Sequence, residues 1–206
     1  MASLRDAQKR MTRALLLDNA LKLFAEKGYQ ATTIEDIAGA AGTTRTTFYL
    51  HFASKSELLA DLLKQVADEV VSADEVKLED VVAGGEVALL RGWLDRNFGN
   101  WEKLRPYLLP AYEAAPSDPV IHETLIGWFE DTIASMHRGL DSAGRYEERD
   151  RRARCVLAFG QFEYTAHRYF SLGWRTPRAD VLRNMTDAWA YLLTDRGLDG
   201  PAAADA

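Results

Sequence analysis

Residues 30–57 of the chain read QATTIEDIAGAAGTTRTTFYLHFASKSE, two short helical patterns separated by a glycine. Thr32 followed by Glu35 is a capping-box pair, which predicts that a helix begins at about Ile34. The apolar residues of this first pattern recur at helical spacing, and Gly42 ends the helix because glycine tolerates a left-handed backbone. A helix, a glycine turn and a second helix form the helix-turn-helix arrangement, which lays its second helix in the DNA major groove.

The second pattern starts at Thr44, the expected N-cap, and runs to about Phe52. On a helical wheel Phe48, His51 and Phe52 share one face, which we expect to pack inside the protein. The opposite face carries Arg45, Thr46, Tyr49 and Leu50. A third capping pair, Ser54 with Glu57, predicts another helix after a short break.

The threonines of the second pattern favour contact over packing. Threonine is a poor helix former because its branched side chain loses rotamer freedom in a helix. Arginine can read guanine through two hydrogen bonds, and threonine offers a methyl and a hydroxyl to base edges or phosphates. The alternative is a solvated helix in an ordinary helical bundle.

In order and spacing, seven segments resemble the DNA-binding domain of the TetR family of bacterial transcriptional regulators, over residues 13–62. Thr43 departs from the family pattern, which has Val or Ile inside this turn. The resembling segments are LFAEKGY at 23–29, ATTI at 31–34, IA at 37–38, AG at 41–42, TFY at 47–49, HF at 51–52 and SKSELL at 54–59.

This resemblance implies roles for individual residues. It implies that Thr33 and Tyr49 contact phosphates, that Lys55 does so from the start of the fourth helix, and that Arg45 and Thr46 face bases. The candidate DNA-binding residues are therefore Thr33, Thr44, Arg45, Thr46, Tyr49, Leu50 and Lys55.

The charge of the chain is divided unevenly. The net charge is −6, but residues 1–55 carry eight basic and five acidic side chains, so residues 56–206 carry −9. This asymmetry predicts a DNA-binding domain over 1–55 and an acidic body over 56–206. Four of the basic residues lie within the first 13 positions, which form either a mobile arm on the DNA backbone or a solvated tail.

Composition bounds the location of the protein. No apolar run approaches the ~20 residues of a membrane span, and no signal peptide is visible at the N-terminus. Cys155 is the single cysteine, so an internal disulfide is excluded and the cytoplasm is the expected compartment. A lone cysteine in an apolar helix is usually a small core residue, with a redox switch as the alternative.

The whole chain is expected to be all-α. We predict an N-terminal three-helix domain with the helix-turn-helix, linked by a long helix to a helical domain for ligand binding and dimerisation. Residues 72–86 are predicted to be a loop with a short helical turn, Pro106 to interrupt a helix, and the tail after Gly197 to be disordered. The long helices are expected at about 9–27, 54–71, 90–101, 107–115, 119–140, 148–172 and 177–195.

The body carries no enzymatic signature. Phosphate-binding glycine motifs, GxSxG and HExxH are absent, so we predict neither an enzyme nor a cofactor. The rival interpretation is a helical enzyme or carrier whose N-terminal motif is only structural. Three pairs at i,i+4 spacing could hold a metal, although surface ion pairs are the commoner use of this spacing. These are Asp118 with His122, His137 with Asp141, and Glu163 with His167.

Aromatic residues are concentrated between positions 93 and 174. Many must fill the core, but such side chains with a few polar groups also line ligand pockets. The TetR resemblance implies a small-molecule effector in this part of the chain, and we expect a hydrophobic or aromatic one. The candidate pocket residues are Trp93, Trp101, Tyr107, Tyr112, Trp128, Phe129, Phe162, Glu163 and His167.

The resemblance also implies a homodimer formed by the last two long helices, which would read a palindromic operator in double-stranded DNA. These helices carry more apolar residues than a single core-facing stripe on each would need. Met185, Trp189 and Leu192 share one helix face. The alternative is that this stripe packs only against its own domain. The candidate interface residues are Phe159, Tyr169, Phe170, Met185, Trp189 and Leu192.

Overall fold

The computed structural model describes residues 4–73 and 76–197, and every secondary-structure element within these ranges is a helix. The expected all-α fold is confirmed. None of the described helices is long and apolar enough to cross a membrane. The predicted disordered tail lies outside the described residues.

Packing divides the chain into two units, which differ from the expected boundary after residue 55. Unit 1 comprises Met1–Val71 and Leu104–Gly127, and unit 2 comprises Ser72–Lys103 and Trp128–Ala206. Most of the fourth helix and a segment from the middle of the chain therefore belong to unit 1.

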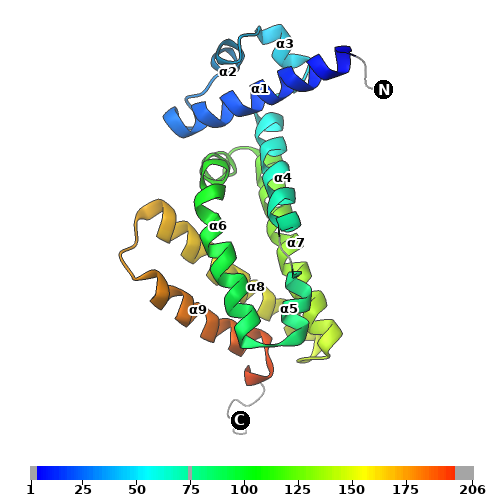
Figure 1. The fold of residues 1–206 in the computed structure, drawn as a ribbon, viewed down its shortest axis with the longest axis vertical. Helices are drawn as coiled ribbons and strands as arrows, with labels where there is room; N and C mark the ends of the chain where they lie inside the picture. Colours follow the sequence, from blue (N-terminus) through cyan, green and yellow to red (C-terminus); the bar gives the residue numbers. More distant parts are fainter. Residues whose placement is uncertain (1–3, 74–75, 198–206) are drawn as a thin grey trace. The chain divides into compact units, whose positions relative to one another are not determined.

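Unit 1 contains four consecutive N-terminal helices: α1 (Leu4–Lys27), α2 (Ile34–Ala40), α3 (Arg45–Tyr49) and most of α4 (Lys55–Ala73) (Figure 1). Because α1 begins at Leu4, the first basic residues lie on a helix and not on the mobile arm considered above. The helices enclose a small apolar core of Leu16, Ala20, Phe24, Ile37, Phe48, Phe52, Leu58 and Leu59.

The capping box of α2 lies one residue later than predicted. Thr33 is the N-cap and Asp36 its partner, in place of Thr32 and Glu35. Thr32 is instead buried, and its hydroxyl donates a hydrogen bond to the carbonyl of Gly28 at 2.7 Å.

Helix α6 (Val87–Ala114) continues through Pro106, which was expected to interrupt it, and through Pro110. Each proline removes one backbone donor from the helix. Buried residues on both sides, including Trp101 and Leu108, hold the helix in place despite this loss. The first part of α6 belongs to unit 2 and the rest to unit 1, whereas α7 (Pro119–Ala143) begins in unit 1 and ends in unit 2.

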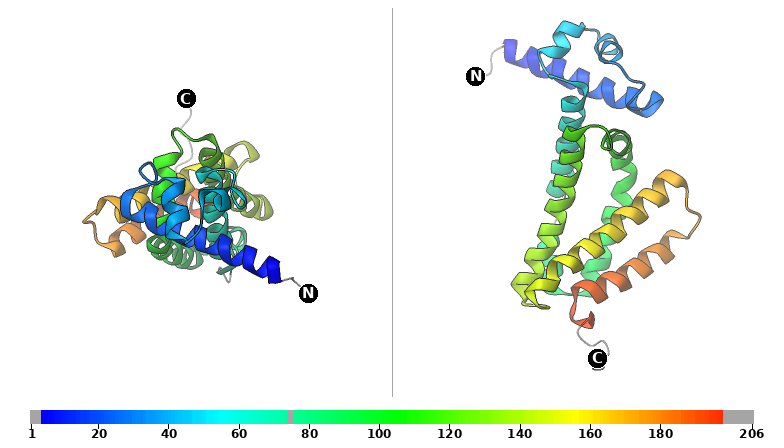
Figure 2. Two further views of the ribbon diagram at one scale, coloured as in Figure 1. Left: turned by 90° about the horizontal axis from the view of Figure 1, so that it is seen from above. Right: turned by 180° about the vertical axis from the view of Figure 1, so that it is seen from behind.

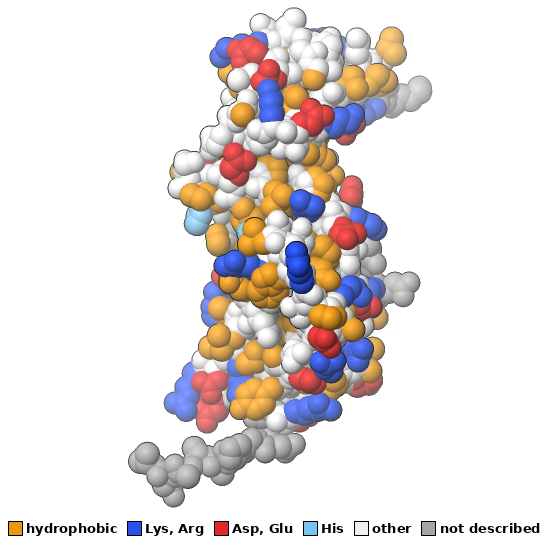
Figure 3. All heavy atoms as spheres, turned by 90° about the vertical axis from the view of Figure 1, so that its left-hand side faces the viewer, with side chains coloured by type: hydrophobic (Ala, Val, Ile, Leu, Met, Phe, Trp, Pro, Cys, Tyr) orange, Lys and Arg blue, Asp and Glu red, His pale blue; other side chains and the backbone are white. Residues whose placement is uncertain are grey.

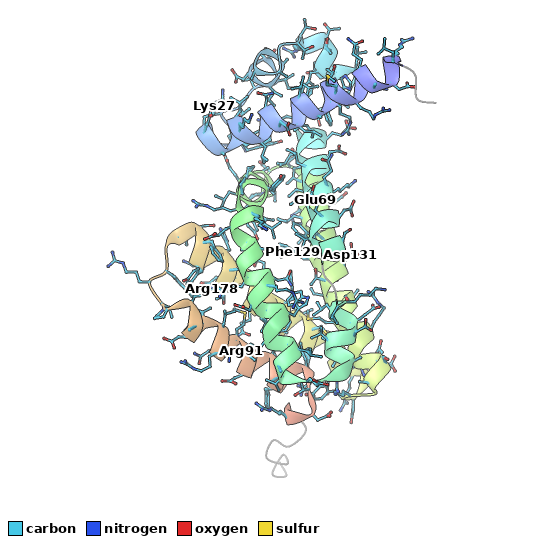
Figure 4. All side chains as sticks on the ribbon, viewed as in Figure 1. Lys27, Glu69, Arg91, Phe129, Asp131 and Arg178 are labelled. Carbon is cyan, nitrogen blue, oxygen red and sulfur yellow. The ribbon has the colours of Figure 1, made fainter. Side chains whose placement is uncertain are left out.

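Unit 2 is completed by α5 (Leu78–Gly84), α8 (Glu148–Leu172), α9 (Arg178–Leu193) and a short 3-10 helix, η1 (Asp195–Gly197). Helix α5 lies in the segment expected to be a loop with a helical turn. Helices α8 and α9 pack side by side as an antiparallel pair, as Figure 2 shows. The start of α9 is tied to α6 by an ion pair between Arg178, labelled in Figure 4, and Asp95 at 2.7 Å.

Candidate nucleic-acid interface

The turn between α2 and α3 is built by local signals. Gly42 has a φ of +65°, the left-handed conformation that glycine adopts without strain. Thr44 then caps α3, because its hydroxyl accepts a hydrogen bond from the backbone N–H of Thr47 at 3.2 Å. The predicted N-cap of α3 is thus found, although the helix ends at Tyr49 and not at Phe52.

Helix α3 has one buried and one exposed face. Phe48 and Phe52 are fully buried, with ring centroids 5.7 Å apart, and the Arg13 guanidinium lies 4.5 Å from the Phe52 ring. On the other face Tyr49 is 45% exposed and Leu50 72% exposed. The exposed candidates of this turn and helix are Thr44, Arg45, Thr46, Tyr49 and Leu50.

Arg45 is oriented by two neighbours. Its guanidinium forms an ion pair with Glu35 of α2 and donates a hydrogen bond to the Tyr49 hydroxyl at 3.4 Å. The hydrogen bond with Tyr49 and the charge of Glu35 raise the pKa of Arg45. The side chain is 60% exposed, so a base or phosphate could replace Glu35 as its partner. No sequence pattern indicates this ion pair between two helices.

Thr33 lies at the positive end of α2, exposed to solvent. Its backbone N–H and its hydroxyl donate to Asp36 at 2.9 and 2.6 Å, and its hydroxyl accepts from the Asp36 N–H at 3.1 Å. Asp36 also accepts from Lys27, at the end of α1 (Figure 4), at 2.6 Å. Lys27 and Thr33 together hold the pKa of the Asp36 carboxyl far below its ordinary value.

Lys55 is more enclosed than a phosphate-binding side chain needs to be. Its ammonium donates to the carbonyls of Tyr29 and Thr32 at 2.6 and 2.8 Å and lies 4.1 Å from the centroid of the Tyr29 ring. Burial lowers the pKa of Lys55, while the nearby carboxylates Glu113 and Asp118 act in the opposite direction. Two of its three N–H donors are therefore used within unit 1.

His51 follows α3 and is half-buried. Its Nδ1 has no hydrogen-bond partner among the described residues. Burial lowers the pKa of His51, and the positive charges of Lys9 and Arg13 lower it further. A neutral imidazole at this position adds no charge to the exposed face of α3.

Comparison with known proteins identifies this region. Residues 16–62 match the family model of bacterial regulatory proteins, tetR family. The chain belongs to the TetR family. The matched residues include the whole helix-turn-helix and the start of α4.

Two curated relatives of this TetR-family chain are named as a transcriptional repressor and a transcriptional regulator. The chain is 41% identical to the HTH-type transcriptional repressor KstR2 of Rhodococcus jostii (strain RHA1) over 73 residues, which are 35% of this chain and 34% of that protein. It is 34% identical to the HTH-type transcriptional regulator AcrR of Shigella flexneri over 80 residues, 39% of this chain and 37% of that protein. These matches span about a third of each relative.

Solved structures are similar over most of the chain. The SmeT–triclosan complex is 25% identical, with a TM-score of 0.67, over 95% of this chain and 97% of that one. A TetR-family protein from Mesorhizobium loti MAFF303099 is 21% identical, with a TM-score of 0.68, over 90% of this chain and 96% of that one. The second likeness concerns the fold alone.

The aromatic candidates of this TetR-family chain form two clusters in unit 2. In the first, the Trp93 ring lies 5.7 Å from Phe162 and stacks on Trp189 at 5.4 Å, and Phe129 reaches Phe162 through Phe159. The indole N–H of Trp93 is buried without an acceptor among the described residues.

The second cluster is a stack around Trp101. Its ring is nearly parallel to those of His167 and Phe170, each at 5.9 Å. The remaining candidates Trp128 and Glu163 are half-buried in unit 2. Tyr107 and Tyr112 belong to unit 1, where burial and the carboxylates of Glu69 and Asp18 raise the pKa of Tyr107.

A groove of about 610 Å³ opens elsewhere on unit 2. It shares no residue with the aromatic clusters and is lined by His137, Glu147, Glu148 and Arg149. Within the described residues, no group of three or more His, Cys, Asp or Glu side chains is arranged to hold a metal. His137 instead pairs with Asp141 at 3.1 Å.

The predicted interface stripe is largely internal to the protomer. Met185 is 2% exposed and Trp189 is fully buried, with its indole N–H donating to the carbonyl of Ala158 at 3.0 Å. Phe159 is 8% exposed. These three side chains belong to the core of unit 2 and pack within the protomer, and their part in a dimer interface stays a prediction. Tyr169, Phe170 and Leu192 are half-buried.

Cys155 is buried in α8. Burial raises the pKa of its thiol to about 12, with the charge of Asp141 acting in the same direction. The neutral thiol behaves as a small core residue.

Proposed function

We propose that this protein is a DNA-binding transcriptional regulator, a repressor that binds a palindromic operator as a homodimer. The observation that carries the proposal is the exposed face of α3 in the region matched to the TetR family. That face presents a guanidinium, hydroxyls, a methyl-bearing threonine and an aromatic ring, the groups that read base edges and phosphates. The name of the relative KstR2 supports repression. A DNA partner also agrees with the expected cytoplasmic location.

In this proposal Arg45 and Thr46 contact bases, while Thr33 and Tyr49 contact phosphates and Thr44 and Leu50 border the surface. Arg45 exchanges Glu35 for a guanine edge when DNA binds, which costs little because the ion pair is exposed. Lys55 acts mainly by fixing the α1–α2 loop, with one N–H left for a phosphate.

A gel-shift experiment tests this proposal with the purified protein and DNA from upstream of its own gene. We expect a retarded band that persists in excess random DNA, because specific binding exceeds non-specific binding by about 10³–10⁷-fold. If random DNA abolished the retarded band at the same excess as unlabelled upstream DNA, specific recognition would be contradicted.

A second copy of the chain is required for a palindrome, because one helix-turn-helix contacts too little DNA. The exposed face of α8 is the surface we propose for this contact. It carries Leu157, Tyr164 and Leu172, which are 62, 51 and 60% exposed and repeat at nearly helical spacing. Figure 3 views the molecule from the side on which α8 and α9 lie in Figure 1, and shows hydrophobic side chains among basic and acidic ones. Such a helix face can pack against its own copy about a twofold axis.

An aromatic effector is proposed for the clusters around Trp93 and Trp101. The SmeT–triclosan complex contains an aromatic compound. The similarity to SmeT covers 95% of the present chain. The indole N–H of Trp93 would donate to an oxygen acceptor on such a compound. The compound must displace or separate packed rings in order to enter.

Triclosan serves as the first probe. At a hundred times its dissociation constant, a ligand adds ~2.7 kcal/mol to the free energy of unfolding, so the melting temperature should rise. Because linkage is reciprocal, the same compound should weaken operator binding. Trp93→Phe keeps an aromatic ring but removes the N–H, and should reduce both effects. An unchanged melting temperature with triclosan and with a set of other hydrophobic aromatic compounds would leave a regulator without this class of effector.

A further inference from the structure

A glutamate far from α3 in the sequence holds the loop that precedes the helix-turn-helix. Glu113, in the last turn of α6, accepts hydrogen bonds from the backbone N–H groups of Tyr29 and Gln30. The distances are 2.8 Å to Oε2 and 3.0 Å to Oε1, so each carboxylate oxygen serves one donor. All three residues belong to unit 1.

The loop is shaped to admit this carboxylate. Gly28 has a φ of +83°, and a Cβ at this position would lie 3.3 Å from Oε2 of Glu113. A side chain there would be strained in conformation and would crowd the carboxylate. Two consecutive N–H groups after a left-handed glycine make a small anion-binding concavity, here occupied by Glu113.

The same loop is held through its carbonyls by the start of α4. Lys55 donates to the carbonyls of Tyr29 and Thr32, while the Tyr29 hydroxyl and the Ser56 hydroxyl are 3.2 Å apart. Ser56 in turn donates a hydrogen bond to Asp118. Asp118 also caps α7, because it accepts from the N–H of Val120 at 3.1 Å. The end of α6 therefore contacts the α1–α2 loop through Glu113, and the segment between α6 and α7 contacts the start of α4 through Asp118.

These contacts end next to the DNA-facing residues. Thr33 directly follows the loop held by Glu113 and is the N-cap of α2. Glu35, also on α2, forms the ion pair that orients Arg45 of α3. A displacement of Gln30 would therefore be carried to Thr33 and to α2 by the backbone. Helix α6 also carries Trp93 and Trp101, so it bears both candidate effector contacts and the glutamate that holds the loop.

We infer that Glu113 is a positioning residue for DNA binding, which fixes the α1–α2 loop so that Thr33 and α2 are presented to phosphate, with Asp118 supporting it through Ser56. This inference rests on the proposed DNA-binding function. The carboxylate acts through the loop and does not touch DNA.

Because Glu113 is negatively charged, the direction of the change in DNA affinity after its replacement tests the inference. Glu113 is anionic, so its removal reduces electrostatic repulsion of DNA and, by charge alone, should leave binding equal or tighter. Loss of a positioning residue should instead weaken binding. Glu123→Ala is the matched control, because Glu123 is an exposed residue of the α7 segment in unit 1 and its replacement removes the same charge.

The experiment measures DNA affinity of the full-length protein by fluorescence anisotropy, with DNA from upstream of its own gene. We expect Glu113→Ala to bind at least ~10-fold more weakly than Glu123→Ala, equivalent to about 1.4 kcal/mol. Glu113→Gln should be intermediate, because its amide oxygen can still accept one of the two N–H groups. Hydrogen exchange of the free variants should be faster in the peptide spanning 28–34 and unchanged in α9.

Three outcomes decide the matter. Affinities of both Glu113 variants equal to or higher than that of Glu123→Ala would overturn the inference. A loss of affinity that only follows a loss of folded protein, measured by thermal melts, would show a structural role and would also overturn it. Failure of the wild-type protein to bind this DNA would count against the proposed function itself, independently of Glu113.

Discussion

The ammonium nitrogen of Lys55 lies 2.8 Å from the carbonyl oxygen of Thr32, inside the unit that carries the helix-turn-helix. A second bond to Tyr29 accompanies it at 2.6 Å. The family resemblance implies a phosphate contact for this lysine, whereas the structure gives it an intramolecular task. Its charge is used to join the start of α4 to the α1–α2 loop.

Replacement of Lys55 by methionine should therefore destabilise the fold as well as weaken DNA binding. Hydrogen bonds from charged donors contribute about 1.5–3 kcal/mol, so Lys55→Met should lower the free energy of unfolding by about 1–3 kcal/mol. Affinity for operator and random DNA should fall together, because the lysine reads no base. Urea unfolding measures the first effect, with Lys22→Met on exposed α1 as control. Equal stability of the two variants would show that the two carbonyl contacts contribute nothing.

Arg45 and Glu35 should change DNA binding in opposite directions. Arg45→Ala is expected to weaken operator binding by ~1–3 kcal/mol and to relax base preference at one position in each half-site. Glu35→Gln removes a negative charge and leaves Arg45 only a neutral amide as its competing partner, so binding should tighten several-fold. Anisotropy titrations at fixed salt, with single-base variants of the operator, measure both. An Arg45→Ala protein with unchanged affinity and base preference would assign base reading to another face.

Asp36 gives a pH dependence with a defined sign. Its pKa is lowered in the folded protein from an ordinary value of 3.8, chiefly by Lys27 and Thr33. The stabilisation is therefore complete above the unfolded-state pKa and is lost as the pH falls below about 4. Wild-type stability, measured by urea unfolding between pH 6 and pH 3, should fall more steeply than that of Asp36→Asn. The same substitution at exposed Asp68 should leave the slope unchanged; a slope unaltered by Asp36→Asn would refute the linkage.

The helix-turn-helix could be predicted because its signals are local. Gly42, the Thr44 cap and the two faces of α3 depend on neighbouring residues only, and the structure places them as expected. The predicted position of the α2 capping box is wrong by one residue, because Thr32 and Thr33 are each followed three positions later by an acidic residue. Burial of Thr32 against Gly28 makes the choice, and that is a tertiary contact.

Local patterns have the same limit in the body of the chain. A periodic stripe such as Met185 and Trp189 predicts a buried face but does not say whether the same chain or a partner covers it. The indole of Trp189 bonds to Ala158 within the protomer, which no spacing rule could indicate. Pro106 was expected to break α6 on local grounds, and burial along the helix outweighs that preference.

Two glycines of α7 should respond to alanine with opposite signs. A Cβ on Gly139 would lie 2.6 Å from the carbonyl oxygen of Glu79 and 2.7 Å from Cβ of Val82, so α5 must shift. Overpacking of this kind costs about 1–3 kcal/mol. Gly127 has no described neighbour within 4 Å of its Cβ position, and alanine there should stabilise the helix by about 0.5–1 kcal/mol. Thermal unfolding of Gly139→Ala and Gly127→Ala measures the difference, and two melting temperatures shifted in the same direction would contradict the packing of α5 on α7.

The proposed dimer should depend on the exposed residues of α8 and not on the buried stripe of α9. Leu157 is 62% exposed in the protomer, so Leu157→Glu should leave the fold intact but place two charges in the proposed interface. Light scattering at micromolar concentration should then report a monomer, with operator affinity reduced because half-sites are no longer bound together. Leu89→Glu is the control, since Leu89 is an exposed leucine of α6, and this variant should remain dimeric.

Trp189→Phe should lower the melting temperature through the lost hydrogen bond to Ala158 and should also remain dimeric. A dimer that survives Leu157→Glu but is lost in Trp189→Phe would move the interface back to α9.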